Sequence, residues 1–223
     1  LRKGDNAKLK LARGADKAMI VALDAAAFDA RGLILAARRP AGGETSPTSS
    51  PDLVLKLKLA KLTGLNDVVF TDVSVDGRLR GGAFAQLEAR ARSPGRRPLN
   101  VAIKPEGGQR RFTVATEDAG AVLSFFDLFD RIGGGTMTLS ARLGAPGVSE
   151  GVLRLVDFHL LEEPKTGRAN ATREAADGTR QIQVRKVESD RSTNFDRASV
   201  RFSMRDGVVN VGEAVAKGIS VGA

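Results

Sequence analysis

The sequence predicts a mainly β fold with a single short helix, because almost the whole chain has the two-residue period of half-buried strands. The clearest case is 53–59, where leucines alternate with Lys56 and Lys58, so that one face is apolar and the other is charged. The same alternation recurs at 83–92, 99–103, 111–115 and 137–143, with glycine-containing turns between the segments. This pattern predicts a sheet of about a dozen strands.

The period changes only between residues 118 and 132, which predicts an amphipathic helix. Thr116 or Asp118 can cap its first N–H groups, and the glycines at 133–135 provide a stop. The polar face holds Ser124, Asp127 and Asp130, and the apolar positions are Val122, Phe125, Phe126, Phe129 and Ile132.

The other segments suggest three parts of the chain. A partial N-terminal β segment at 1–37 has strands at 8–11, 17–23 and 28–35, and a Pro-, Gly- and Ser-rich stretch at 38–52 predicts a flexible linker. The rest, 53–223, is expected to be one β domain truncated at its end. Its further strands are expected at 67–75 before a turn at Asp76-Gly77, at 152–161 with both faces apolar and buried, at 181–187, at 198–204 and 208–211 around an Asp206-Gly207 turn, and at 219–221.

Composition indicates a folded protein without thiol chemistry. The chain has 223 residues, 42% of them hydrophobic and 27% charged, and no cysteine. A sizeable core is therefore expected, whereas disulfides and thiolate metal sites are excluded, and no cofactor is expected. No apolar run reaches the roughly 20 residues that span a bilayer. Because Leu1 is not an initiator methionine, we expect a fragment of a longer protein that carries any anchor elsewhere.

A net charge of +9 favours an anionic partner such as nucleic acid or a membrane surface. The basic residues, however, are spread over nearly every segment, and the chain has no Tyr or Trp that could stack on bases. We therefore expect no nucleic-acid partner. The simpler interpretation of the charge is a solvated outer face of the sheet.

Two stretches together resemble the C-terminal region of the AsmA-like family, in particular its large YhdP-type members in Gram-negative bacteria. They are EDAGAVLSFFDLFDRIGGGTMTLSARL and FDRASVRFSMRDGVVNVGEAVAKGISVGA, and the resemblance covers roughly 53–223. Asp-Ala-Gly precedes an apolar helix and a glycine-rich strand, and a later hairpin starts near an aromatic residue and turns at Asp-Gly. The matching positions are Asp118, Ala119, Gly120, 133–135, Phe195, Phe202, Asp206 and Gly207.

The resemblance implies a long curled antiparallel sheet, a taco-like trough whose apolar inner face carries phospholipid acyl chains towards the outer membrane. It also implies a periplasmic location, an inner-membrane anchor absent from this fragment, and envelope proteins as partners. Residues 166–192 depart from the family pattern, because they are polar where members have a more apolar segment with a further helix. Whether this stretch interrupts the trough stays open.

The candidate lipid contacts combine the one-sided strands with the helix. A sheet that is apolar on one face must cover it with a second layer or with a ligand. For each candidate residue the alternative is ordinary packing in a core. The candidates are Leu55, Leu57, Leu59, Leu87, Val122, Phe126, Phe129, Met137 and Leu139.

Catalytic patterns are weak in this sequence, and we expect no enzyme and no metal site. His159 is the only histidine and lies in an apolar segment, which indicates a structural role. Asp127 and Asp130 share a helix face but lack a convergent partner. The glycines at 133–135 follow a helix and lack the Lys-Ser/Thr ending of a phosphate loop.

Three classes of function therefore remain. The first is a lipid-handling envelope module with an open apolar trough. The second is a structural or protein-binding β domain, in which the helix closes the core and sheet edges recruit a partner by strand addition. The third is a charge-driven nucleic-acid module, whose affinity would fall steeply with salt.

Overall fold

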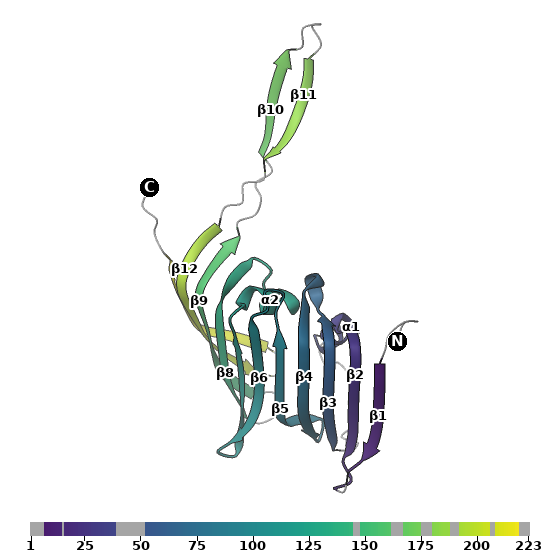
Figure 1. Ribbon diagram of the computed structural model, residues 1–223. Helices are drawn as coiled ribbons and strands as arrows, with labels where there is room; N and C mark the ends of the chain where they lie inside the picture. Colours follow the sequence, from purple (N-terminus) through teal and green to yellow (C-terminus); the bar gives the residue numbers. More distant parts are fainter. Residues whose placement is uncertain are drawn as a thin grey trace.

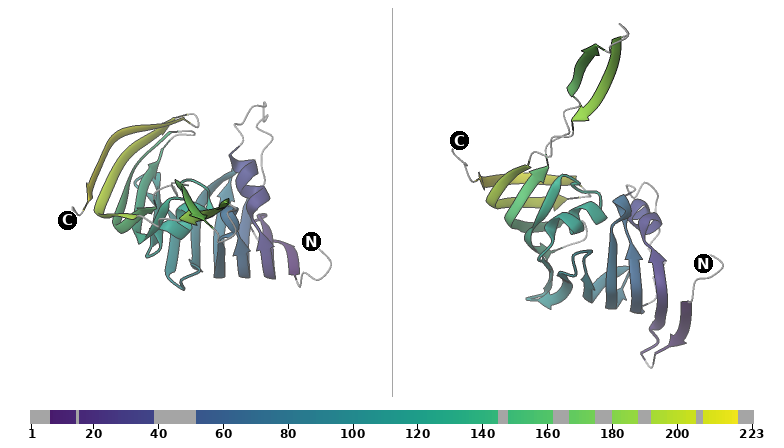
Figure 2. Two further views of the ribbon diagram at one scale, coloured as in Figure 1. Left: turned by 90° about the horizontal axis from the view of Figure 1, so that it is seen from above. Right: turned by 45° about the horizontal axis from the view of Figure 1, so that its top comes forward.

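The computed structural model describes residues 7–14, 16–38, 52–144, 148–161, 167–174, 180–187, 192–205 and 208–218. It is mainly β, with 73% in strands, and eleven of the strands form one sheet that does not close (Figure 1). These strands follow in chain order, and the sheet twists so that β12 and β13 run at a steep angle to β1 (Figure 2). They are β1 (Ala7–Arg13), β2 (Met19–Asp29), β3 (Leu53–Thr63), β4 (Val69–Arg80), β5 (Ala83–Arg92), β6 (Pro98–Glu106), β7 (Gln109–Thr116), β8 (Ile132–Leu143), β9 (Val148–Leu161), β12 (Ser192–Arg205) and β13 (Val208–Gly218).

The sheet is mixed, so the expectation of a wholly antiparallel sheet is wrong at one place. Strands β2 and β3 are parallel, from Met19 opposite Leu53 to Asp29 opposite Thr63, and the other neighbours in the sheet are antiparallel. Parallel strands need a crossover connection, which here contains helix α1 (Arg31–Ala37). The sheet therefore continues across the predicted 38–52 linker, most of which (39–51) lies outside the described residues.

The predicted strand at 28–35 is wrong, because its second half is helix α1. Strand β2 ends at Asp29, whose carboxylate accepts a hydrogen bond from the backbone N–H of Arg31 at 3.1 Å. The amide of Ile34 then donates to the carbonyl of Ala30 at 2.9 Å, which forms the first helical turn. Ile34 packs against the core while Leu33 and Leu35 stay exposed.

The predicted helix at 118–132 exists, but it is only half as long: α2 spans Ala119–Phe125. The predicted cap is confirmed, because Asp118 accepts a hydrogen bond from the Ala121 amide at 3.1 Å. Asp127 ends the helix with φ +47°, while its amide donates to Ser124 and that of Leu128 donates to Leu123. This is a Schellman ending with Asp in the place usually taken by Gly. The glycines at 133–135, expected to stop the helix, lie in β8.

Two aspartates with positive φ change the side-chain alternation inside strands. Asp72 (φ +52°) lies at a register shift between β4 and β5, and Phe70 and Val73 on either side of it are both buried. Asp157 (φ +53°) also changes the side-chain alternation in β9, so that Leu155 and Phe158 both reach the core. The expectation that 152–161 is buried on both faces is therefore wrong, since Val156 is 42% exposed.

The remaining expectations are met in most places. Strand β5 has the predicted bounds, and β6 and β7 form the predicted hairpin. The predicted turn at Asp76-Gly77 is wrong, because β4 runs on to Arg80. Strands β12 and β13 pair from Arg205 opposite Val208, as expected for a hairpin, although Asp206-Gly207 itself and the expected strand at 219–221 lie outside the described residues.

The polar stretch at 166–192 does not interrupt the large sheet. It supplies β10 (Gly167–Glu174) and β11 (Arg180–Val187), which pair with each other in a separate two-stranded sheet. Strand β9 pairs directly with β12 over a long register, from Val148 opposite Arg205 to Leu161 opposite Ser192. No helix among the described residues has the length and apolar character required to cross a bilayer.

Both edges of the open sheet carry exposed apolar side chains. Leu9 and Leu11 on β1 are 58% and 65% exposed, and Val209 and Val211 on β13 are 58% and 61% exposed. An edge strand also presents unpaired backbone N–H and C=O groups, which favour pairing with another chain. The two edges are therefore sites at which the sheet can be extended.

We expect this chain to self-associate in solution through these edges. The double variant Leu11→Lys and Val211→Lys should shift it towards monomer, because an edge lysine disfavours strand pairing. Light scattering after size-exclusion chromatography measures the mass, and Thr138→Lys on the central strand β8 is the matched control. A wild type that is monomeric over a wide concentration range would contradict the prediction.

Candidate functional site

An uninterrupted row of apolar residues crosses all eleven strands on one face of the sheet. Consecutive partners in the strand registers define it, one residue from each strand. The row, which we call the central apolar row, consists of Leu9, Leu23, Leu57, Val75, Ala89, Val101, Val114, Leu139, Leu153, Val200 and Ala214.

Similar rows flank it two residues away along each strand, except that the register shift between β12 and β13 places Val211 three residues from Ala214. On one side every position is apolar or glycine: Leu11, Val21, Leu55, Gly77, Leu87, Ile103, Phe112, Ala141, Gly151, Phe202 and Val211. On the other side the shift at Asp72 divides the row, and Thr116 is its one polar member. That row contains Ala7, Ala25, Leu59 and Val73, and then Ala91, Leu99, Thr116, Met137, Leu155, Ala198 and Ala216.

Six of the nine candidate lipid contacts fall in these three rows. Leu59 and Met137 are 4% exposed and behave as core, whereas the other four are half-buried. The six are Leu55, Leu57, Leu59, Leu87, Met137 and Leu139.

The three candidates from the predicted helix are not brought together. Val122 is buried in α2, but Phe126 and Phe129 follow the end of this helix and are 41% and 44% exposed. They were expected on one helix face with Val122. The early helix end at Asp127 places them in the connection to β8 instead.

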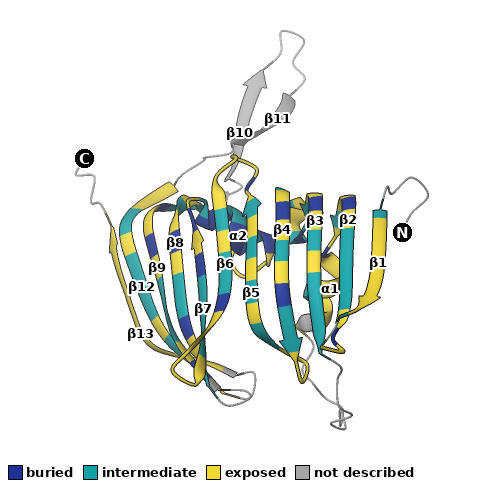
Figure 3. Ribbon diagram, turned by 60° about the horizontal axis from the view of Figure 1, so that its bottom comes forward, coloured by how far each residue is buried: buried dark blue, intermediate teal, exposed yellow. Residues whose placement is uncertain are grey.

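Helix α2 lies at one end of the middle strands, where it packs against the flanking row that contains Met137 and Leu155. The ring of Phe125 meets Phe70 of β4 edge to face, with centroids 4.9 Å apart, and both side chains are buried. Val122 and Leu123 join the same core cluster as Met137 and Leu155. Figure 3 shows buried stretches at the ends of β2, β3 and β4 beside the helices. The packed core is therefore concentrated at the helix end of the sheet.

Asp127 joins the two helices and the short 3-10 turn η1 (Leu65–Asp67). Its carboxylate accepts hydrogen bonds from Arg38 after α1 and from Asn66 in η1, both at 3.2 Å. The hydrogen bond from Asn66, and then that from Arg38, hold the pKa of Asp127 below its usual value. This junction therefore stabilises the folded protein at pH values above the carboxyl pKa of the unfolded chain. The stabilisation is lost as the pH falls through the lower pKa that Asp127 has in the folded protein. Sequence reasoning missed Arg38 and Asn66, which are distant in the chain.

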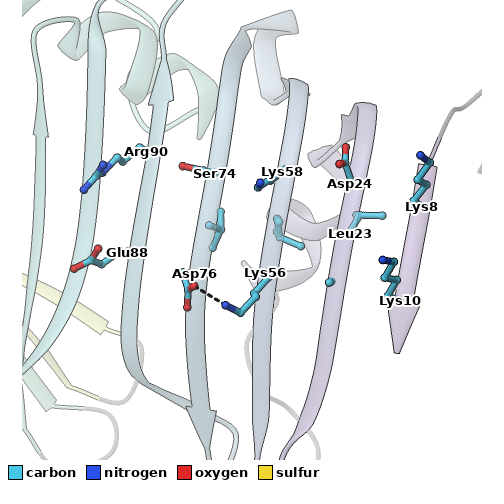
Figure 4. A pocket seen from close by; sticks show the side chains of 13 residues that line it. Lys8, Lys10, Leu23, Asp24, Lys56, Lys58, Ser74, Asp76, Glu88 and Arg90 are labelled. Carbon is cyan, nitrogen blue, oxygen red and sulfur yellow. Dashed lines mark ion pairs between the residues drawn. The ribbon is translucent and has the colours of Figure 1, made fainter. Parts of the chain in front are cut away.

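The opposite face of the sheet is polar. At the β1–β5 end, basic and acidic side chains alternate across neighbouring strands around a shallow groove, and Lys56 pairs with Asp76 at 3.3 Å (Figure 4). Lys8, Asp24, Lys58, Ser74 and Arg90 follow one another in register across the five strands. This end of the face has the mixed charge of a solvated sheet surface.

The residues considered for catalysis take structural positions. A Cβ on Gly133 would overlap the imidazole of His159, so the glycine leaves space for this ring. Asp127 belongs to the helix junction described above. Among the described residues, no group of three or more His, Cys, Asp and Glu side chains could hold a metal ion.

No protein-family model matches the chain, and no curated protein and no solved structure matches it either. The AsmA-like resemblance therefore rests on the motif residues alone and stays a hypothesis.

Proposed function

We propose that this chain is a non-enzymatic module of the bacterial envelope that holds phospholipid acyl chains in an open apolar trough. The observation that carries the proposal is the central apolar row, eleven residues long without a polar interruption. Adjacent strands lie about 4.8 Å apart, so the row extends for roughly 48 Å. An apolar strip of this length needs a cover, and acyl chains are long, flexible and apolar enough to supply one.

The distribution of burial supports an open trough over most of the sheet. Helices α1 and α2 are seven residues long each: α2 packs on β8, β9, η1 and Phe70 of β4, and Ile34 of α1 packs against the same core. Two helices of this length are too short to cover rows that cross eleven strands. Leu23, Leu57, Val75 and Leu153 of the central row are only half-buried. In this proposal the sheet curls around the apolar rows, the chain lies in the periplasm, and an anchor outside this sequence holds it at the inner membrane.

The alternative is a structural or protein-binding β domain in which the same face is closed. The tight burial of Leu59, Met137 and Leu155 around α2 favours it locally. In that case the half-buried leucines would contact protein and not lipid.

Lipid analysis of matched variants separates the two functions. The wild type, purified from a Gram-negative host, should carry phospholipid in native mass spectrometry. Leu57→Asp and Val75→Asp place a carboxylate on neighbouring positions of the central row and should remove most of that lipid, because burying an unpaired charge among acyl chains is costly.

Ser74→Asp is the matched control, since Ser74 neighbours Val75 in β4 but lies on the polar face. It should retain lipid like the wild type, and circular dichroism verifies that all variants are folded. A wild type that is folded, soluble and free of lipid would contradict the trough and favour the closed domain.

A further inference from the structure

The polar face of the sheet is strongly basic at the β7–β13 end. Two neighbouring grooves there share Arg154 as a lining residue, with volumes of about 560 and 340 Å³. Six cationic side chains line them, and Glu150 is the one acidic lining residue. The cations are Arg111, Arg142, Arg154, Arg197, Arg201 and Lys217.

The other end of the same face is the natural comparison. The groove over β1–β5 is lined by five cations and three carboxylates, and Lys8, Lys56 and Lys58 each have an acidic neighbour in register (Figure 4). The positive charge is therefore partly balanced at the β1–β5 end, with three carboxylates for five cations, and much less so at the β7–β13 end, with one carboxylate for six cations. In the sequence these six cations are far apart, because they come from five strands, β7, β8, β9, β12 and the edge strand β13.

Few of these cations are neutralised within the protein. Arg111 pairs with Glu106 at 2.5 Å and Arg201 pairs with Glu213 at 3.5 Å. Arg142 and Arg154 are both exposed, and neither forms an ion pair within the part of the chain that the structure describes. In register, Arg142 lies between Arg111 on β7 and Glu150 on β9. Like charges directly opposite each other destabilise a sheet, and the single carboxylate offsets only part of the repulsion between the two arginines. A bound anion would relieve this repulsion.

We propose that these two grooves bind phosphate groups, with Arg142 and Arg154 as the central ligands. A guanidinium can donate two parallel hydrogen bonds to a phosphate, and this favours arginine over lysine for phosphate recognition. Ser140, Ser203 and Asn210 line the larger groove and add neutral donors. The phosphate could belong to a lipid headgroup or to a soluble phosphorylated molecule, since both present the same oxygens.

This site is independent of the proposed acyl trough because it lies on the opposite face of the sheet. A nucleic-acid duplex fits it less well, since its backbone would need a longer continuous line of cations than two small grooves supply. The chain also has no Tyr or Trp for stacking on single-stranded bases.

The test compares two double variants that each remove two positive charges from the same face. Arg142→Gln with Arg154→Gln changes the grooves, and Lys8→Gln with Lys10→Gln changes the β1–β5 end. Inorganic pyrophosphate is titrated by calorimetry at low salt, and flotation with phosphatidylglycerol vesicles tests the headgroup source. We expect the arginine variant to lose at least about tenfold in affinity, because two charge-assisted hydrogen-bonding groups are removed, and the lysine variant to stay within about twofold.

The outcomes are distinct. Pyrophosphate binding that only the arginine variant loses supports a soluble ligand, and vesicle binding that only this variant loses supports a headgroup. Vesicle binding by this site should persist in Val75→Asp, which removes trough lipid only. The proposal is overturned if the wild type binds neither probe, if both double variants lose affinity equally, or if duplex DNA binds more tightly than either probe and depends on the same arginines.

Discussion

Replacing Gly120 with alanine should lower the free energy of unfolding by more than about 3 kcal/mol. Gly120 lies in α2, where an added Cβ would overlap the carbonyl oxygen of Ile132 and approach the Gly133 Cα and the Gly134 amide nitrogen, both at 3.1 Å. These are backbone atoms of β8, which is held by its register with β9. A change of side-chain rotamer cannot relieve such a clash, so either the helix or the strand has to move.

Gly32→Ala in α1 is the matched control, because nothing lies within 4 Å of the Cβ it would add. Alanine has a higher helix propensity than glycine, so this variant should keep or gain up to about 1 kcal/mol. Urea unfolding followed by circular dichroism measures both variants. If Gly120→Ala unfolds within about 1 kcal/mol of the wild type, the close seat of α2 on β8 is incorrect.

The strands could be predicted from the sequence because their signal is local. Alternation at 53–59 and 83–92 depends only on which neighbouring residues are apolar, and β3 and β5 follow it. The start of α2 was equally local, since Asp118 caps it through its own side chain.

Two of the errors share one physical cause, which is the backbone conformation of an aspartate. Asp127 ends α2 early, and Asp157 changes the face of the residues in β9, each with a positive φ. Asp adopts this left-handed conformation less often than Gly, so the residue type alone does not predict a positive φ at these two positions. The apolar spacing beyond Phe125 continued a helical period by coincidence.

The candidate site was predicted in part for a related reason. The alternation within each strand predicts that Leu57 and Leu139 lie on the apolar face. Only the strand register shows that both belong to a single row across the sheet. Register also gathers Arg142 and Arg154 at one pair of grooves. The residue spacing within a segment does not specify which distant segment it pairs with. The apolar rows and the basic grooves could therefore be identified only from the structure.

The second large effect is expected at the contact between Phe70 and Phe125, which attaches α2 to the sheet. Each ring is buried, and a Cβ on Gly64 would overlap the ring of Phe125, so this ring fills its site tightly. Phe70→Ala and Phe125→Ala should each destabilise the protein by about 3–5 kcal/mol, through lost burial and an unfilled cavity. Phe129→Ala, with a ring 44% exposed, should cost less than about 1 kcal/mol and is the control for the residue type.

A double-mutant cycle distinguishes a direct contact from two separate core positions. Because the rings meet edge to face at 4.9 Å, the double variant should lose less than the sum of the two single variants, by about 0.5–1.5 kcal/mol. Strict additivity in urea unfolding would mean that α2 is not attached through this pair. With the coupling present, α2 is fixed against the middle strands of the sheet, and the half-buried positions around Leu57 and Val75 are the ones at which the proposed acyl contacts are tested.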